Sequence, residues 1–412
     1  MKTYLLSAYA CEPNKGSEPG VGWNWALELA KTDRVIVITR SNNKHVIEMF
    51  AVENPNVKLP EFHYCDIPKQ ISFWKKRQQG LYLYYVIWQI LCYRLATEIV
   101  KKEKVDIAMS ITFGNMWLPT FMYKLPCDFV WGPIGGGECV PRVFWKRMGW
   151  KQGVYERIRK INMYFPATNP WFYTACKKAK LIIVRTKDSL ACIPSRFQEK
   201  CIINIETGIS DNDINMFQQY SNNAEPSTDT TKCDFVICGR LIKLKMVDLA
   251  IEAYARIHNK DGVGKLYILG SGKEEARLAK LISMYKLESC ILLQGNVQRR
   301  NVLKIMNECG VLVMSSAKEG GTWVMFEAML LKKPIVCFNT SGMAEVETSE
   351  TGILVPISSY WDSVDQFSQA MLSLAQDIAL REKLGKQAFQ LVSHKFHWSN
   401  HVKSFQMKIN EL

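Results

Sequence analysis

Apolar stretches of strand length alternate with stretches of helical periodicity along the first half of the chain. A helix is predicted at 23–32, and strands are predicted at 2–10, 34–41, 105–113, 128–136 and 180–187. Strands that alternate with helices in this way form parallel sheets with right-handed crossovers. The first half therefore predicts a doubly wound α/β domain.

The second half repeats the alternation more regularly. Helices are predicted at 247–260, 273–287, 299–309 and 324–333, and strands at 232–241, 265–272, 290–297, 310–316, 334–341 and 352–356. Residues 210–232 are polar and show little periodicity, so we interpret them as a linker or insertion. Two doubly wound domains that face each other would place the carboxyl ends of their strands, and their ligands, in one cleft. We expect domains at 1–205 and 206–390, with a C-terminal helix in 391–412 that packs back on the first domain.

Composition narrows the class of protein. A chain of 412 residues with 48% hydrophobic and 22% charged residues is globular and long enough for two domains. Thirteen cysteines without any C-x-x-C pair argue against a zinc site or a disulfide framework and favour a cytoplasmic location. The start, MKTYLLSAYAC, is interpreted as a first strand rather than a signal peptide. No apolar run reaches the roughly 20 residues needed to span a bilayer, so 81–93 is expected to form a buried or interfacial helix.

Two glycine-rich stretches of the first half follow predicted strands. Gly20 and Gly22 in KGSEPGVGW precede a helix, where backbone amides favour a phosphate. The alternative is a plain tight turn, because the stretch lacks the full G-x-G-x-x-G spacing. The stretch WGPIGGGECVP places three consecutive glycines after a strand, which indicates either a functional backbone shape or a flexible turn. Its residues of interest are Gly135, Gly136, Gly137 and Glu138.

Two charged stretches of the second half suggest an anion site. Arg240 and Lys245, in GRLIKLK, follow the first strand of that half, where two cations can hold a diphosphate. In SAKEGGTWVMFEAML, Glu319 precedes a glycine pair and Glu327 lies inside a predicted helix. The amides of Gly320, Gly321 and Thr322 would form an anion nest at the start of that helix. A carboxylate at Glu327 would accept hydrogen bonds from hydroxyl groups such as those of a ribose.

In this order the motifs resemble those of the GT4-type retaining glycosyltransferases, which have the two-domain GT-B fold. The likeness rests on GRLIKLK, YILGSGKEEARL, LLQGNV, KKPIVCFNTSGMAEV, TGILV and the two glutamates, Glu319 and Glu327, eight positions apart. GSEPGVGW and GPIGGGE look like a bacterial polysaccharide-synthesis branch of that family.

The resemblance implies a role for each matching residue. Arg240 and Lys245 would hold the donor diphosphate, Glu327 the ribose and Glu319 the sugar hydroxyls, while Gly20 and Gly22 would close over the phosphates. It implies a retaining hexosyltransferase that needs no metal and no cofactor, with front-side substitution assisted by the leaving diphosphate. The chain departs from the family where GGTW replaces Gly-Phe-Gly, and none of its six histidines falls in these motifs. The D-x-D-like Asp211–Asp213 is interpreted as part of the polar linker.

The expected partners follow from charge and from the same resemblance. A net charge of +14 attracts anionic partners, and the charge alone does not choose among nucleic acid, anionic lipid and phosphorylated metabolites. Residues 70–104 and 142–180 interleave basic and aromatic residues, which suits an anionic membrane surface or, equally, helices with buried aromatic residues and solvated lysines. We expect a UDP- or GDP-sugar donor, a glycan or lipid-linked glycan acceptor, peripheral membrane association and no nucleic acid. The alternatives are a sugar-nucleotide epimerase of the same fold and a basic nucleic-acid-binding protein.

Overall fold

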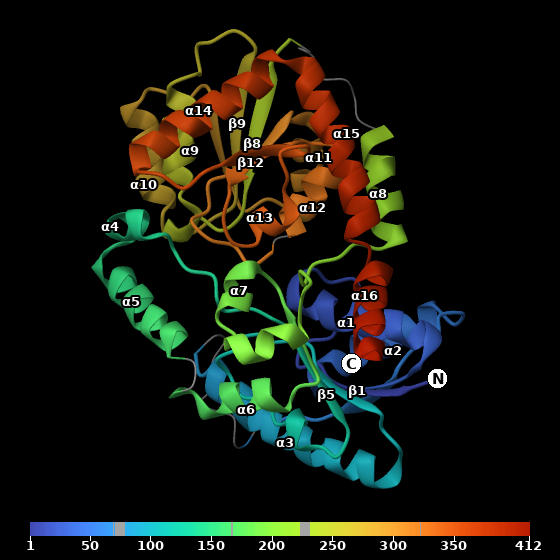
Figure 1. Cartoon of the computed structure of the whole chain (residues 1–412). Coiled ribbons are helices and arrows are strands. Elements are labelled where there is room, and N and C mark those ends of the chain that lie inside the picture. The colour runs from blue at the N-terminus through green and yellow to red at the C-terminus, as the bar shows by residue number, and fades with distance from the viewer. Residues whose placement is uncertain (69, 71–78, 166–167, 223–230, 322) are drawn as a thin grey trace. The chain divides into compact units, whose positions relative to one another are not determined.

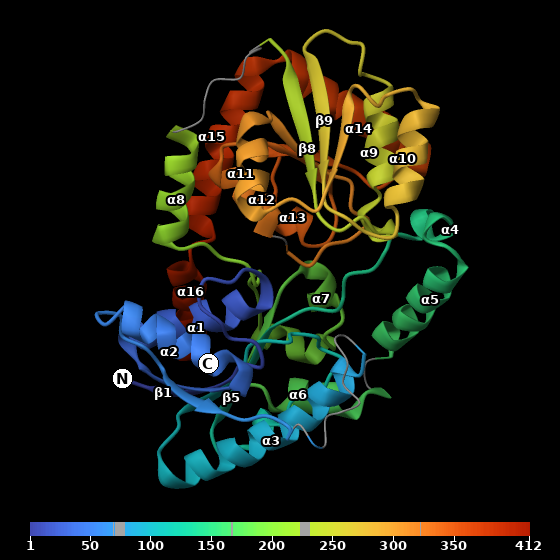
Figure 2. The same cartoon turned by 180° about the vertical axis from the view of Figure 1, so that it is seen from behind.

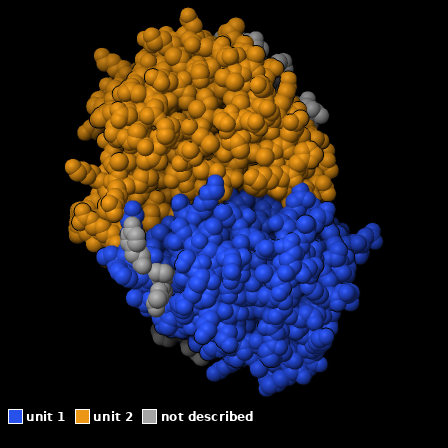
Figure 3. Space-filling model, in the orientation of Figure 1, with its two compact units in different colours: residues 1–137, 160–208, 398–412 blue, residues 138–159, 209–397 orange. Residues whose placement is uncertain are grey.

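The computed structural model describes residues 1–68, 70, 79–165, 168–222, 231–321 and 323–412. The chain divides into two compact units, coloured separately in Figure 3, and each is built on one parallel sheet. Unit 1 comprises residues 1–137, 160–208 and 398–412, and unit 2 comprises 138–159 and 209–397. The predicted α/β architecture with two doubly wound parallel sheets is confirmed.

The sheet of unit 1 has the strand order β3-β2-β1-β4-β5-β6-β7. Its strands are β1 (Thr3–Ser7), β2 (Arg34–Thr39), β3 (Glu61–Tyr64), β4 (Ile107–Ser110), β5 (Asp128–Ile134), β6 (Leu181–Val184) and β7 (Cys201–Ile203). The central strands are continuous apolar runs because helices cover both faces of a parallel sheet. Its helices are α1 (Ser17–Thr32), α2 (Lys44–Glu53), α3 (Leu81–Lys102), α6 (Pro170–Lys178), α7 (Lys187–Ala191) and α16 (Trp398–Glu411).

Helix α3 is a core helix of unit 1. Its Tyr85, Trp88 and Cys92 are buried against strand residues such as Leu5 and Ile36. This agrees with the expected buried or interfacial helix at 81–93. In the described part of the chain, no helix combines the length and the apolar character needed to cross a membrane.

The sheet of unit 2 has the strand order β10-β9-β8-β11-β12-β13. Its strands are β8 (Cys233–Cys238), β9 (Val263–Leu269), β10 (Ile291–Gly295), β11 (Val311–Met314), β12 (Ile335–Phe338) and β13 (Gly352–Val355). Helices α9 (Val247–Ala255), α10 (Glu275–Met284) and α14 (Tyr360–Gln376) lie on one side of the sheet, and α8 (Asp211–Asn222), α11 (Arg299–Glu308), α12 (Trp323–Leu330) and α15 (Ile378–Lys395) on the other (Figures 1 and 2). The short α13 (Met343–Val346) follows β12.

A segment from the first half of the sequence belongs to unit 2. It carries α4 (Trp145–Met148) and most of α5 (Trp150–Tyr164). Phe144 packs on Phe338 with ring centroids 5.4 Å apart. The Arg147 guanidinium lies 3.3 Å from the centroid of the Tyr360 ring and 3.5 Å from an Asp248 carboxylate oxygen. Although this segment lies inside the expected first domain of 1–205, these contacts join it to unit 2.

Two local predictions were wrong. The stretch expected to be a linker or insertion starts with helix α8, and Asp211–Asp213 forms its first turn. The reason is a reciprocal cap: Ser210 Oγ accepts from the Asp213 backbone N–H at 3.2 Å, and the Asp213 carboxylate accepts from the Ser210 N–H at 2.9 Å. Residues 223–230 of this stretch lie outside the described residues.

The glycines expected in a loop after β1 lie in helix α1 instead. Gly20 and Gly22 are both buried in its first two turns. A Cβ on Gly22 would stand 2.2 Å from the Ala10 carbonyl oxygen, so close packing of the helix on the β1–α1 connection requires glycine there.

Glu347 generates a pH prediction for unit 2. Its carboxylate is buried next to α13, where it accepts hydrogen bonds from the Thr351 hydroxyl and from the Thr348 N–H at 3.2 Å. Burial raises the pKa of Glu347 from 4.5 to about 7. Between these values the folded protein holds a proton that the unfolded chain has released, so stability falls as pH rises through this window.

We expect Glu347→Gln to remove that fall. At ~1.4 kcal/mol per pKa unit, the wild type should lose about 3 kcal/mol more than the variant between pH 4.5 and 7. Urea unfolding of both proteins across this range measures the difference. The exposed neighbour Glu350 provides the control: Glu350→Gln should follow the wild type. Parallel pH profiles for wild type and Glu347→Gln would contradict the assignment.

Candidate functional site

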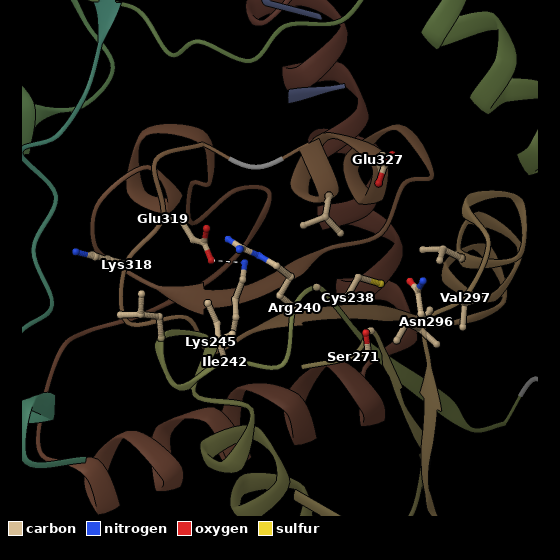
Figure 4. Close-up of a pocket in the computed structure, with 16 residues that line it drawn as sticks. Cys238, Arg240, Ile242, Lys245, Ser271, Asn296, Val297, Lys318, Glu319 and Glu327 are labelled. Atoms are coloured by element: carbon tan, nitrogen blue, oxygen red, sulfur yellow. Dashed lines mark hydrogen bonds and ion pairs between the residues drawn. The ribbon is translucent and has the colours of Figure 1, made fainter. Parts of the chain in front are cut away.

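A pocket of about 560 Å³ lies at the carboxyl ends of β8, β9 and β10 in unit 2. The connection after β11 and the start of α12 complete its wall (Figure 4). Strand β8 has β9 on one side and β11 on the other, so the chain reverses its winding direction at β8. Open α/β sheets bind ligands at this switch point, because the connections diverge there and leave a crevice.

Two glycines shape the floor of the pocket. Gly239 and Gly270 end β8 and β9 with φ values of +145° and +139°. A Cβ on Gly270 would stand 1.9 Å from the Gly239 carbonyl oxygen, so the two strand ends can approach each other only without side chains. Backbone is therefore exposed to a ligand at the point where β8 gives way to the charged stretch.

The structure brings three of the predicted site residues together. Arg240, Lys245 and Glu319 all line the pocket, and Figure 4 shows the Arg240 side chain beside the other two. Lys245 Nζ donates to Glu319 Oε1 at 2.5 Å, and both side chains are mostly buried. The pair joins the connection after β8 to the connection after β11. A charge-assisted bond of this kind is strong, and an entering anion would compete with Glu319 for the ammonium.

Backbone contacts hold the connection that carries Glu319. The Ala317 N–H donates to the Leu244 carbonyl at 2.8 Å, and the Gly342 N–H donates to the Glu319 carbonyl at 2.8 Å. A Cβ on Gly342 would stand 2.0 Å from the Gly320 carbonyl oxygen. Glycine is therefore required at position 342, where the backbone of Gly320 and Gly321 passes close by. Thr322 lies outside the described residues.

Glu327 lines another part of the pocket, from inside helix α12. Burial raises the pKa of its carboxyl group, and the nearby Arg299 opposes this shift. Arg299 Nη2 lies 2.9 Å from Glu327 Oε1, and the arginine side chain is largely exposed at the start of α11. Arg299 was not among the predicted site residues. The sequence holds one signal for Arg299: the arginine pair Arg299-Arg300 comes directly after the short connection that follows β10.

Lys318 is a second residue that the sequence reasoning missed. It lines the pocket, but its ammonium points away from Glu319 (Figure 4) and lies 2.9 Å from Glu156 Oε1 in helix α5. Glu156 is fully buried and also accepts from Gln152 Nε2 at 3.1 Å. Nothing in the sequence links two residues 162 positions apart.

Gly20, Gly22 and the residues of the GPIGGGE stretch are not among those that line this pocket. Gly135, Gly136 and Gly137 follow β5 in unit 1, where the Gly137 N–H donates to Ser189 Oγ at 3.3 Å. Glu138 is buried and begins the segment that belongs to unit 2. The pocket consists of residues of unit 2 alone, so a contribution of Gly20, Gly22 or these glycines to ligand binding stays a prediction.

The segment that holds the pocket is similar to a known family. Residues 220–391 match the family model described as Glycosyl transferases group 1. The pocket lies wholly within this glycosyl transferases group 1 segment.

Curated relatives are similar over part of their length. A poly(ribitol-phosphate) alpha-N-acetylglucosaminyltransferase of Staphylococcus aureus is 28% identical over 159 residues, which are 38% of this chain and 31% of that protein. An N-acetyl-alpha-D-glucosaminyl L-malate synthase of Bacillus anthracis is 26% identical over 165 residues, 40% of this chain and 42% of that protein. The matches thus span less than half the length of these relatives.

Solved structures are similar over the whole chain. Anabaena Alr3699/HepE in complex with UDP superimposes with a TM-score of 0.60 and 16% identity over 100% of both chains. At this identity the likeness concerns the fold alone, and it confirms the expected two-domain GT-B fold.

The buried ion pair beside the pocket generates a stability prediction. Lys318→Met would leave the Glu156 carboxylate buried without its counter-charge, which typically costs about 3–5 kcal/mol. The double variant Lys318→Met/Glu156→Gln removes both charges and should regain much of that loss. Urea unfolding of both single variants and the double variant measures the coupling. Additive effects of the two substitutions would show that the ion pair does not stabilise the group 1 segment.

Proposed function

We propose that this protein is a glycosyltransferase that moves a sugar from a nucleoside diphosphate onto an acceptor hydroxyl. The observation that carries the proposal is the convergence of Arg240, Lys245, Glu319 and Glu327 in one pocket at the switch point of the unit 2 sheet. The pocket's place inside the matched group 1 segment supports the same reaction.

Each charged group has a role in this proposal. The diphosphate binds Arg240 and Lys245, and Lys245 exchanges Glu319 for a phosphate oxygen when the donor enters. Glu319, thus released, accepts hydrogen bonds from the sugar hydroxyls. Glu327 accepts hydrogen bonds from the ribose, since a carboxylate placed next to phosphate would repel it.

The reaction places new negative charge on the leaving diphosphate. Two cations and the backbone amides beside Gly320 and Gly321 stabilise that charge in the transition state, and one such contact is typically worth about 2.7–4 kcal/mol. On this basis the transfer needs no metal ion. We propose front-side substitution with retention, which the alpha-linked products named for the Staphylococcus and Bacillus relatives support for an α-configured donor.

UDP is the proposed nucleotide, because a structural neighbour binds UDP in the same fold. The proposed acceptor is a lipid-linked glycan of a bacterial surface polysaccharide. Such an acceptor would bring the enzyme to the inner face of the plasma membrane. A thermal-shift screen against sugar nucleotides identifies the donor, and incubation without acceptor distinguishes transfer from epimerisation of the donor.

We expect transfer to persist in excess EDTA, because protein cations and amides cover the diphosphate. The measurement is product formation from the donor found in the screen, with and without chelator. An NMR spectrum of the product reports its anomeric configuration, which should match that of the donor. Activity that EDTA abolishes and magnesium or manganese restores would contradict the proposed metal independence, and an inverted product would contradict retention.

The two glutamates should respond differently to substitution. Glu327→Ala should weaken UDP binding by about 1.5–3 kcal/mol, the usual contribution of hydrogen bonds to a charged group. Glu319→Gln should bind UDP as tightly as the wild type or more tightly, because it removes the competitor for Lys245. It should nevertheless lower turnover, since its contact with the sugar is made mainly in the transition state.

Calorimetry with UDP and steady-state kinetics test both variants. Glu382→Gln, at an exposed position of α15, is the matched control and should leave affinity and turnover unchanged. A loss of UDP affinity in Glu319→Gln as large as that in Glu327→Ala, or full turnover in Glu319→Gln, would refute the assigned roles.

A further inference from the structure

Helix α5 presents its apolar side chains to solvent. Trp150 is 76% exposed, and Val154, Ile158 and Ile161 are between 44% and 57% exposed. Their spacing of four, four and three residues places them on one face of the helix. Large apolar side chains usually form the covered face of a surface helix, so this face calls for a partner.

Polar contacts hold the opposite face of α5 against unit 2. Gln152 and the fully buried Glu156 occupy that face, and Glu156 is paired with Lys318. At the margin between the two faces, the Arg157 guanidinium carbon lies 5.9 Å from the centroid of the Trp145 ring of the preceding α4. The position of the helix is therefore set by its polar side. Its apolar side remains available to a ligand.

The charge around this face has a single sign. Residues 139–165 contain seven lysines and arginines and one acidic residue, which is the buried Glu156. Lys151 and Arg157 are exposed and flank the apolar stripe on its two sides. The outer surface of α5 is thus apolar at its centre and positive at its margins.

Helix α3 buries three of its aromatic residues, although Tyr82 and Leu83 at its start are exposed. Both helices come from stretches that interleave basic and aromatic residues. In α3, Tyr84, Tyr85 and Trp88 are buried in the core of unit 1, so the interpretation of buried aromatic residues applies there. Residues 71–78 of that stretch lie outside the described residues.

We propose that the outer face of α5 binds the surface of an anionic lipid bilayer. Trp150, Val154, Ile158 and Ile161 enter the interface between headgroups and acyl chains, and the flanking cations contact lipid phosphates and carboxylates. The inference deepens the proposed function and rests on it, since it names the element through which the enzyme reaches a lipid-linked acceptor.

A bilayer explains this face better than a second copy of the chain does. Two copies joined through α5 would bring two positive margins together, and like charges repel across an interface. An anionic bilayer complements the positive margins, and its flat surface needs no specific shape complementarity with the apolar stripe. The second copy is therefore an outcome of the test rather than the proposal.

Vesicle flotation tests the proposal with the full-length protein. The vesicles contain phosphatidylglycerol mixed with phosphatidylcholine, or phosphatidylcholine alone. We expect binding to the anionic vesicles in low salt and release in high salt. Trp150→Ser/Ile158→Ser should reduce binding at least tenfold, and Lys151→Gln and Arg157→Gln should reduce it about fivefold each.

Met284→Ser/Ile378→Ser is the matched control, because it removes two exposed apolar side chains from other helices of unit 2. It should bind vesicles like the wild type. Unchanged UDP binding and an unchanged unfolding transition in the α5 variants exclude a folding defect as the cause of lost binding.

Three results would overturn the inference. The first is equal vesicle binding by the wild type and the α5 double variant. The second is a loss of vesicle binding in the control as large as that in the α5 double variant. The third is a wild-type dimer that Trp150→Ser/Ile158→Ser dissociates without any change in vesicle binding. Failure of the proposed function is distinguishable from these: the protein would bind anionic vesicles through α5 but would transfer no sugar to a water-soluble acceptor analogue. Conversely, an α5 variant that loses vesicle binding but still transfers sugar to the soluble analogue supports both the proposed function and the proposed membrane contact.

Discussion

The ion pair between Lys245 and Glu319 is the contact around which the candidate site is organised. It joins the connections after β8 and β11, which lie on neighbouring strands at the switch point of the sheet. In the absence of a ligand it satisfies one cation and one carboxylate that are both largely withdrawn from water. Because an unpaired charge in this setting is costly, the pair holds the two connections together.

Adjacent residues of the same connection point in opposite directions. Glu319 reaches into the pocket toward Lys245, and Lys318 reaches out to Glu156 in α5. The connection is thereby fixed between the sheet on one side and a helix from the first half of the sequence on the other. This second contact also explains how α5 stays in place although its apolar side chains point outward. The connection that carries Glu319 and the proposed lipid-binding helix are thus joined by the ion pair of Lys318 and Glu156.

Local sequence determined the larger part of the fold. Strand–helix alternation predicted the parallel sheets, because apolar runs of strand length need cover on both faces. Arg240 and Lys245 could be predicted because they follow a predicted strand, and ligand sites of such sheets lie at the carboxyl ends of their strands. Glu319 and Glu327 were grouped with them through the family resemblance. The short strands Glu61–Tyr64 and Cys201–Ile203 were missed, since three or four residues are too few to show a period. Helix α8 was missed because its cap, Ser210 with Asp213, was interpreted as part of a polar linker.

Other features depend on residues that meet only in the folded chain. Lys318 and Arg299 have ordinary sequence surroundings, and their carboxylate partners come from other elements. Gly22 and Gly342 are required by backbone that crosses them, and a linear pattern carries no information about such crossings. The composition of residues 142–180 suited an anionic membrane surface and helices with buried aromatic residues equally. Only the tertiary structure shows which face of α5 is covered, because the pairing of Glu156 with Lys318 turns the polar face inward and leaves Trp150 and Ile158 exposed to solvent.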